Sequence, residues 1–262
     1  SGLFVRADGF YDVADNDYPV DVSAYDSVGR ITYVTVRRFH GGYHGRGATV
    51  GVGLADRSWA DRLVLQGFYA DYYNDLQHGA TMARPYGEVT FDRRTAGTNL
   101  TYDVGRGGAT ELRTVAGYAY LDARFLDRSS CIYDWYGICT PRANEAVTGE
   151  INGTPEDRQL LSHTVFLRTT LQHRFHPSHR FRLALATTHT SRLGSDRTLS
   201  AENDALSRPR RLTTAVFGAE LESNVWDGRI ANVASVKGYF LHTGSEALLA
   251  TGDWKDMSAT LP

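Results

Sequence analysis

The 262-residue chain has few lysines, no net positive charge and no long apolar run, and the last two absences argue against two classes of protein. Lys237 and Lys255 are its only lysines, and its formal net charge is -2. A protein that follows a nucleic-acid backbone needs a basic surface, so nucleic acid is not an expected partner. No apolar run reaches the roughly 18 residues of a membrane-spanning helix. Membrane-crossing strands alternate apolar and polar residues, and this test does not exclude them.

Catalytic and metal-binding motifs are also missing. The sequence contains no GxSxG, no HExxH and no phosphate-binding glycine loop, so we predict no enzyme activity and no catalytic residue. His173, His176 and His179 surround a predicted turn, but carboxylate support is absent there and a solvated turn is an ordinary place for histidine. We therefore expect neither a bound metal nor a cofactor.

The chain has two cysteines, Cys131 and Cys139. Seven residues separate them, and Gly137 lets this short segment bend. We predict that they form a disulfide, which requires an oxidising compartment such as a periplasm or the cell exterior. A pair of free thiols is the alternative.

Residues 158–192 carry the clearest structural pattern, because they read as two long strands joined by a tight turn at 176–178. In the first strand Val165, Leu167 and Leu171 share one side, while the residues between them are mostly polar. Each arm sustains this alternation for more than ten residues. A soluble strand is typically about 5 or 6 residues long, whereas a strand that crosses a membrane needs roughly 9 to 11. The pattern therefore favours a membrane.

The same alternation recurs along the chain and predicts nine long strands in up-and-down order. The predicted strands cover 2–12, 46–55, 61–77, 86–104, 109–125, the two arms of the hairpin above, 210–226 and 229–242. A β-rich piece at 30–39 is expected to form a hairpin arm above the membrane, and 243–262 to form a loop.

The predicted connections fall into two classes. Four are brief, around Ser58, Gly107, Pro177 and Gly228, and the others are long. Brief turns on one rim and long loops on the other are typical of bacterial outer-membrane barrels. The expected fold is therefore all-β: an antiparallel up-and-down transmembrane β-barrel wall of about nine long strands, covering 1–262. Single-chain bacterial barrels close with even strand counts, so we expect this wall to be an internal part of a larger barrel.

Four features resemble the barrel of TonB-dependent outer-membrane receptors: NDYP at 16–19, RSWADRL at 57–63, DYYNDLQHG at 71–79, and a long loop with a short disulfide. The resemblance implies a barrel of roughly 22 strands in the bacterial outer membrane. It also implies a plug domain carrying a TonB box, and uptake of a small ligand such as a siderophore, a corrinoid or a sugar. The chain departs from that pattern because it shows no plug, no TonB box and fewer than half of the strands.

The partners implied by the resemblance are the remainder of the barrel, the plug domain, TonB through that plug, outer-membrane lipid and lipopolysaccharide, and a small-molecule ligand. The aromatic residues between the cysteines, Tyr133, Trp135 and Tyr136, are the predicted ligand contacts, because a closed loop presents its rings at little ordering cost. Packing within the loop is the alternative interpretation.

Two groups of arginines lie near the predicted outer rim, where they would bind an anionic ligand or lipopolysaccharide phosphates through paired hydrogen bonds. They are Arg37, Arg38 and Arg46, and separately Arg208, Arg210 and Arg211. A solvated rim without ligand is the alternative for both groups.

Two other functions remain open at this point. A porin-like channel or a surface adhesin would share the barrel wall but would have no plug or TonB box upstream. A soluble all-β binding protein, a sandwich or a propeller, would have much shorter strands than those predicted.

Overall fold

The computed structural model describes residues 2–25, 28–144, 147–226 and 229–245. This part of the chain is all-β. None of its residues belongs to a helix that is long and apolar enough to cross a membrane.

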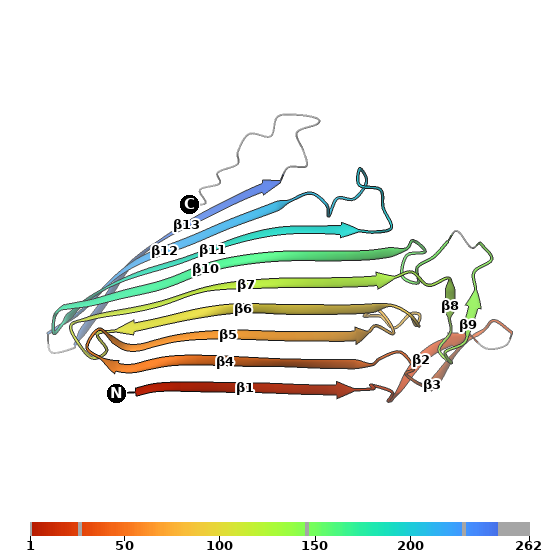
Figure 1. Cartoon of the computed structure of the whole chain (residues 1–262), viewed down its shortest axis with the longest axis horizontal. Helices are drawn as coiled ribbons and strands as arrows, with labels where there is room; N and C mark the ends of the chain where they lie inside the picture. The colour runs from red at the N-terminus through yellow and green to blue at the C-terminus, as the bar shows by residue number, and fades with distance from the viewer. Residues whose placement is uncertain (1, 26–27, 145–146, 227–228, 246–262) are drawn as a thin grey trace.

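Nine long strands form one antiparallel sheet in which each strand pairs with the next long strand along the chain (Figure 1). Their lengths run from 13 to 21 residues, about two to four times the usual strand length in soluble proteins. The strands are β1 (Gly2–Ala14), β4 (Tyr43–Arg57), β5 (Ala60–Asp75), β6 (Thr90–Val104), β7 (Thr110–Asp127), β10 (Glu156–His176), β11 (His179–Asp196), β12 (Arg210–Val225) and β13 (Ile230–Ser245). The predicted nine-stranded meander is confirmed.

Two small hairpins are inserted between the long strands. One is β2 (Pro19–Tyr25) with β3 (Ile31–Arg37), and the other is β8 (Cys131–Tyr133) with β9 (Cys139–Pro141). The first contains residues 31–37 of the arm predicted at 30–39, as strand β3. The loop predicted over 243–262 does not begin at residue 243, because backbone pairing with β12 continues β13 to Ser245. The predicted turn at 227–228 and residues 246–262 lie outside the described residues.

The connections are sorted between the two ends of the sheet. At one end, which we call the turn end, β4 joins β5 through residues 58–59, and β10 joins β11 through 177–178. At the opposite loop end the connections are long, and both small hairpins lie there (Figure 1). Among the described residues the sheet is open. Its outer strands β1 and β13 run in the same direction, because the number of strands is odd.

One face of the sheet, the apolar face, carries a continuous set of exposed hydrophobic side chains. Cross-strand partners in an antiparallel sheet point to the same side, so the strand registers place these residues together. All of the following are exposed: Leu3, Val5, Val50, Val52, Leu65, Leu100, Tyr118, Val165, Leu171, Leu183, Leu185, Phe217, Leu221, Val236 and Phe240. No described element packs over either face of the sheet.

The opposite face, the polar face, carries amides, hydroxyls and charged groups such as Gln66, Asn99 and Arg168. Glycines on neighbouring strands leave room for phenylalanine rings directly across from them. Five such cross-strand pairs occur: Phe4 with Gly53, Phe10 with Gly47, Phe68 with Gly97, Phe166 with Gly117, and Phe217 with Gly238. The first four lie on the polar face. Each ring occupies the space that a side chain at the glycine would need, and this fixes the register of the two strands.

Candidate functional site

The loop end carries a folded cap made from the described residues of three connections, 15–42, 76–89 and 128–155. Several contacts join these segments. The imidazole Nε2 of His40 lies 2.8 Å from the carbonyl oxygen of Val89, and Gly87 N and Glu88 N donate to the Glu150 carboxylate at 2.6 and 2.8 Å. We call this unit the loop cap, and it contains the ligand-contacting aromatic residues predicted from the sequence.

Trp135 forms the centre of the small hydrophobic core of the loop cap. Only 3% of the residue is exposed, and it packs with Val22, Ala24 and Val36 of the β2–β3 hairpin. The indole therefore holds the disulfide segment against the hairpin. Of the two interpretations that the sequence left open for Trp135, the structure shows packing within the cap.

Tyr133 and Tyr136 lie differently from Trp135 and from each other. The Tyr133 ring closes over Gly87, and its hydroxyl donates to Glu88 Oε1 at 2.8 Å. Burial and the neighbouring Glu88 carboxylate raise the pKa of Tyr133 to about 12. Tyr136 is 61% exposed at the tip of the same segment. Among the three predicted aromatic residues, Tyr136 is the most available to a ligand.

The predicted disulfide between Cys131 and Cys139 is confirmed. The segment that it closes is ordered further by Asp134, whose Oδ1 accepts hydrogen bonds from the backbone N–H groups of Tyr136 and Ile138, both at 2.9 Å. Aspartate commonly forms such local bonds in turns. The disulfide and the hydrogen bonds of Asp134 thus both restrain the exposed tip of the segment.

The predicted arginines do not gather at one place in the described part of the chain. Arg37 Nη1 lies 2.6 Å from Asp17 Oδ2, and Arg38 binds Gln77 and the Tyr18 hydroxyl within the loop cap. Arg208 and Arg210 belong to the connection and strand near the other edge of the sheet, beyond β11 (Figure 1). Arg37 and Arg38 therefore already have protein partners, and Arg210 is exposed on a different part of the rim.

Buried carboxylates organise the long loops, a role that the sequence did not reveal. Asp127 accepts hydrogen bonds from the N–H groups of Glu150 and Ile151, and Asp204 accepts one from Asp196 N at 2.9 Å. Asp127 and Asp204 are both almost fully buried. Asp127 binds backbone donors 23 and 24 residues away, and Asp204 binds the end of β11 from within a long connection, so no sequence spacing identifies these contacts. Asp127 and Asp204 therefore support the long loops.

Glu150 gives the loop cap a dependence on pH. The residue is 4% exposed, and burial raises the pKa of its carboxyl group even though Gly87 N and Glu88 N donate hydrogen bonds to it. A raised pKa in the folded state means that protonation favours the folded cap. This stabilisation of the folded cap by protonated Glu150 is present in full at pH values below the ordinary glutamate pKa. It is lost as the pH rises through the raised pKa of the folded state. We expect the Trp135 fluorescence transition of the cap to need more denaturant at pH 4.5 than at pH 7.5.

The matched variants separate Glu150 from other titrating groups. Glu150→Gln should weaken this difference between the two pH values, since the amide does not titrate. Glu202→Gln, on an exposed loop elsewhere, should leave it unchanged. An equal pH response in the wild type and in Glu150→Gln would show that another group is responsible.

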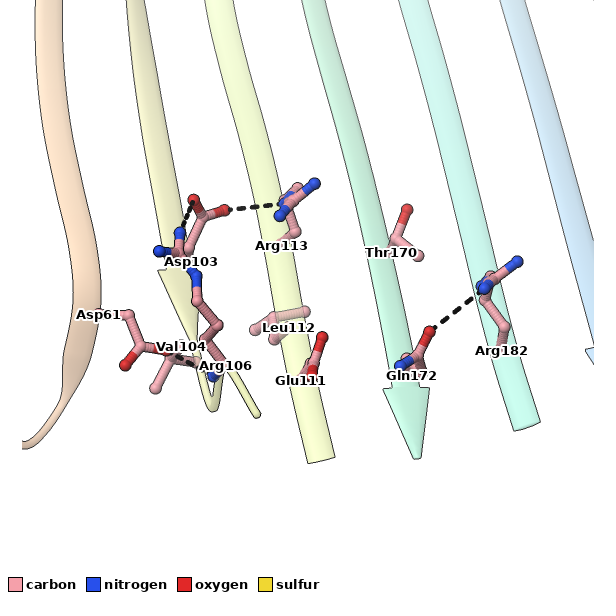
Figure 2. A pocket seen from close by; sticks show the side chains of 10 residues that line it. All are labelled: Asp61, Asp103, Val104, Arg106, Glu111, Leu112, Arg113, Thr170, Gln172 and Arg182. Carbon is pink, nitrogen blue, oxygen red and sulfur yellow. Dashed lines mark hydrogen bonds and ion pairs between the residues drawn. The ribbon is translucent and has the colours of Figure 1, made fainter. Parts of the chain in front are cut away.

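A polar pocket of about 240 Å³ lies on the polar face near the turn end (Figure 2). Its walls alternate carboxylates and guanidinium groups. Arg113 Nε lies 3.3 Å from Asp103 Oδ1, and Arg182 donates to Gln172 Oε1 at 3.3 Å and to Glu220 Oε1 at 2.8 Å. Opposite charges are thus largely paired within the wall. The pocket lining is polar and charge-balanced, with three carboxylates and three arginines, and contains no nucleophile beside a general base.

In the described residues, no group of three or more histidine, cysteine, aspartate or glutamate side chains is arranged to hold a metal ion. The comparisons with known proteins add no relative: no family model, no curated protein and no solved structure matches the chain.

Proposed function

We propose that the chain is part of the wall of a TonB-dependent receptor in a bacterial outer membrane, with the loop cap facing the cell exterior and contributing to capture of a small nutrient. The observation that carries the proposal is the uncovered apolar face. A soluble monomer rarely exposes a contiguous apolar patch larger than a few hundred Å², whereas this face extends across all nine strands. Contact with lipid hydrocarbon accounts for such a surface.

The height of the apolar face supports a bilayer. On β10, His163 and His173 flank a central apolar stretch of this face, and on β11 His179 and His189 flank another, with the pair Leu161 and Leu193 lying beyond them toward the loop end. The two histidines on each strand are separated by ten residues. Ten residues span about 33 Å of strand, which at the usual tilt of about 45° is a height of roughly 23 Å and close to the apolar band of outer-membrane barrels.

The two ends of the sheet also suit a membrane. Trp59 and Trp226 are exposed beside turns at the turn end, where aromatic rings lie at a membrane interface. The long connections and the loop cap would extend from the other side, as in outer-membrane barrels. An open edge in lipid leaves backbone groups unpaired, so β1 and β13 would pair with the remainder of the barrel.

The membrane part of the proposal is tested with two single-cysteine variants that carry the polarity-sensitive dye NBD. The background has Cys131 and Cys139 replaced by alanine. On β5, Leu65→Cys lies on the apolar face and Gln66→Cys on the polar face. In lipid vesicles we expect a blue-shifted emission that brominated lipid quenches for the first variant only. Equal emission from both, with the chain released by a carbonate wash, would exclude a membrane wall.

The receptor part needs a separate test in cells. Deleting the gene should abolish uptake of one scarce nutrient, and dissipating the proton-motive force should abolish it in the wild type. A porin-like channel or an adhesin is the alternative. Uptake that needs the gene but continues without the proton-motive force would favour a channel and exclude the receptor. The ordered, disulfide-closed loop cap favours the receptor, because a ligand then binds without ordering the loops.

A further inference from the structure

We propose that the apolar face carries a binding site for the phosphate of an outer-leaflet lipid at its rim toward the loop end. The site consists of Arg211, His163, His189 and His242, which we call the outer basic patch. This inference rests on the proposed membrane location and adds a specific lipid contact to it.

The strand registers bring the four residues together on one face. His189 on β11 pairs with Thr213 on β12, and Thr213 pairs with His242 on β13. Arg211 lies one step further along β12, opposite Ser191, which in turn pairs with His163. Neighbouring strands are about 4.8 Å apart and two residues span about 6.7 Å. The Cα atoms of the three histidines therefore lie roughly 8–10 Å from that of Arg211, which is the longest side chain of the patch and lies between them.

The outer basic patch differs from the rest of the same rim because its arginine is not paired with a carboxylate in the described part of the chain. Arg46 on β4 is held by Asp71 at 2.9 Å, and Arg124 on β7 is held by Asp157 at 2.8 Å. In the described parts of β11, β12 and β13, by contrast, no carboxylate lies on the apolar face. Arg211 is exposed there, and a guanidinium remains charged at any physiological pH. Its charge is left for a ligand.

The surroundings select a lipid over a free anion. Val165 pairs with His189 at the edge of the patch, and Phe240 and Phe217 continue the exposed apolar face below it. A molecule with a phosphate head and acyl chains satisfies both surfaces at once, whereas inorganic phosphate satisfies only the first. Side-chain positions are partly set in advance, since His189 Nδ1 lies 2.8 Å from Thr213 Oγ1 and the His242 ring stacks on Phe240. Arginine forms paired, charge-assisted hydrogen bonds with phosphate oxygens.

The test measures binding of lipid A to the full chain in detergent micelles, with bisphosphorylated lipid A, enzymatically dephosphorylated lipid A and inorganic phosphate as the three ligands. We expect bisphosphorylated lipid A to bind at least tenfold more tightly than the dephosphorylated form, and inorganic phosphate to bind at least a hundredfold more weakly than either. The double variant Arg211→Gln/His242→Asn should lose at least tenfold in affinity for the bisphosphorylated lipid only.

Arg46→Gln is the matched control, because it removes an arginine at the same rim whose charge Asp71 already holds. It should bind lipid A like the wild type. Equal loss in both variants, or no preference for the phosphorylated lipid, would overturn the proposal. Circular dichroism checks that each variant keeps its strand content. If the NBD experiment shows no membrane contact, the proposed function itself fails; if it shows contact and the phosphate preference is absent, only the lipid site fails.

Discussion

Replacing Leu185 with arginine is expected to destabilise the chain in lipid vesicles by about 2–4 kcal/mol, the cost of an arginine on the lipid side of a barrel near the bilayer midplane. Leu185 lies on the apolar face of β11, six residues from His179 and four from His189, which flank the central apolar stretch of that strand. The guanidinium would have to leave water or draw water into the hydrocarbon. Urea titration of the vesicle-folded protein measures the loss.

The control lies one residue away. Ala184 is exposed at the same height but on the polar face, where it pairs with Thr170. Ala184→Arg should change the free energy of unfolding by less than about 0.5 kcal/mol, the usual range for a surface substitution. In a soluble protein both faces meet water, and neither variant would be costly. A small, equal effect of both substitutions would therefore contradict the membrane wall.

Gly97→Val is expected to prevent or severely impair folding. A Cβ atom at Gly97 would lie 2.6 Å from Phe68 Cζ and closer still to the backbone carbonyl oxygen of Tyr118. A ring can rotate away, but the carbonyl belongs to the neighbouring strand and cannot move without breaking the ladder. Overpacking of a well-packed site costs about 1–3 kcal/mol and occasionally more, and a backbone clash places this variant at or above the upper limit. The refolded fraction in vesicles and its urea midpoint measure the effect.

Gly67→Val serves as the comparison on the adjacent strand. The nearest atom to a Cβ there lies 4.0 Å away, an ordinary van der Waals contact. We expect near wild-type folding, since valine is also favoured in strands. Phe68→Ala should fail to rescue Gly97→Val, because the Tyr118 carbonyl remains in place. Rescue by Phe68→Ala would show that the ring alone, and not the backbone, excludes a side chain at Gly97.

These two predictions concern different properties of the same sheet. Leu185→Arg tests whether the apolar face contacts lipid or water. Gly97→Val tests how closely the strands pack on the polar face. If Gly97→Val impairs folding but Leu185→Arg does not destabilise the protein, the strand packing of the sheet is supported and its proposed membrane location is contradicted. A function in uptake would then have no physical basis, whereas the loop cap would still be an ordered, exposed binding surface.

The amino-acid sequence determined the long strands and the disulfide, because both depend on local pattern. The alternation through Val165, Leu167 and Leu171 is read within one strand, and Cys131 and Cys139 are close enough along the chain to meet in almost any fold. The contrast between brief and long connections is equally local. These features require no knowledge of which strands are neighbours.

Only the tertiary structure decided what the candidate site residues do. Trp135 became a core residue because the β2–β3 hairpin, about a hundred residues earlier in the sequence, folds over it. Arg37 pairs with Asp17, while the strand registers place Arg211 on the same face as three histidines from other strands. The burial of a side chain and the charges around it depend on neighbours that lie far apart in the sequence. For this reason residue type and spacing could nominate these side chains but could not assign their partners.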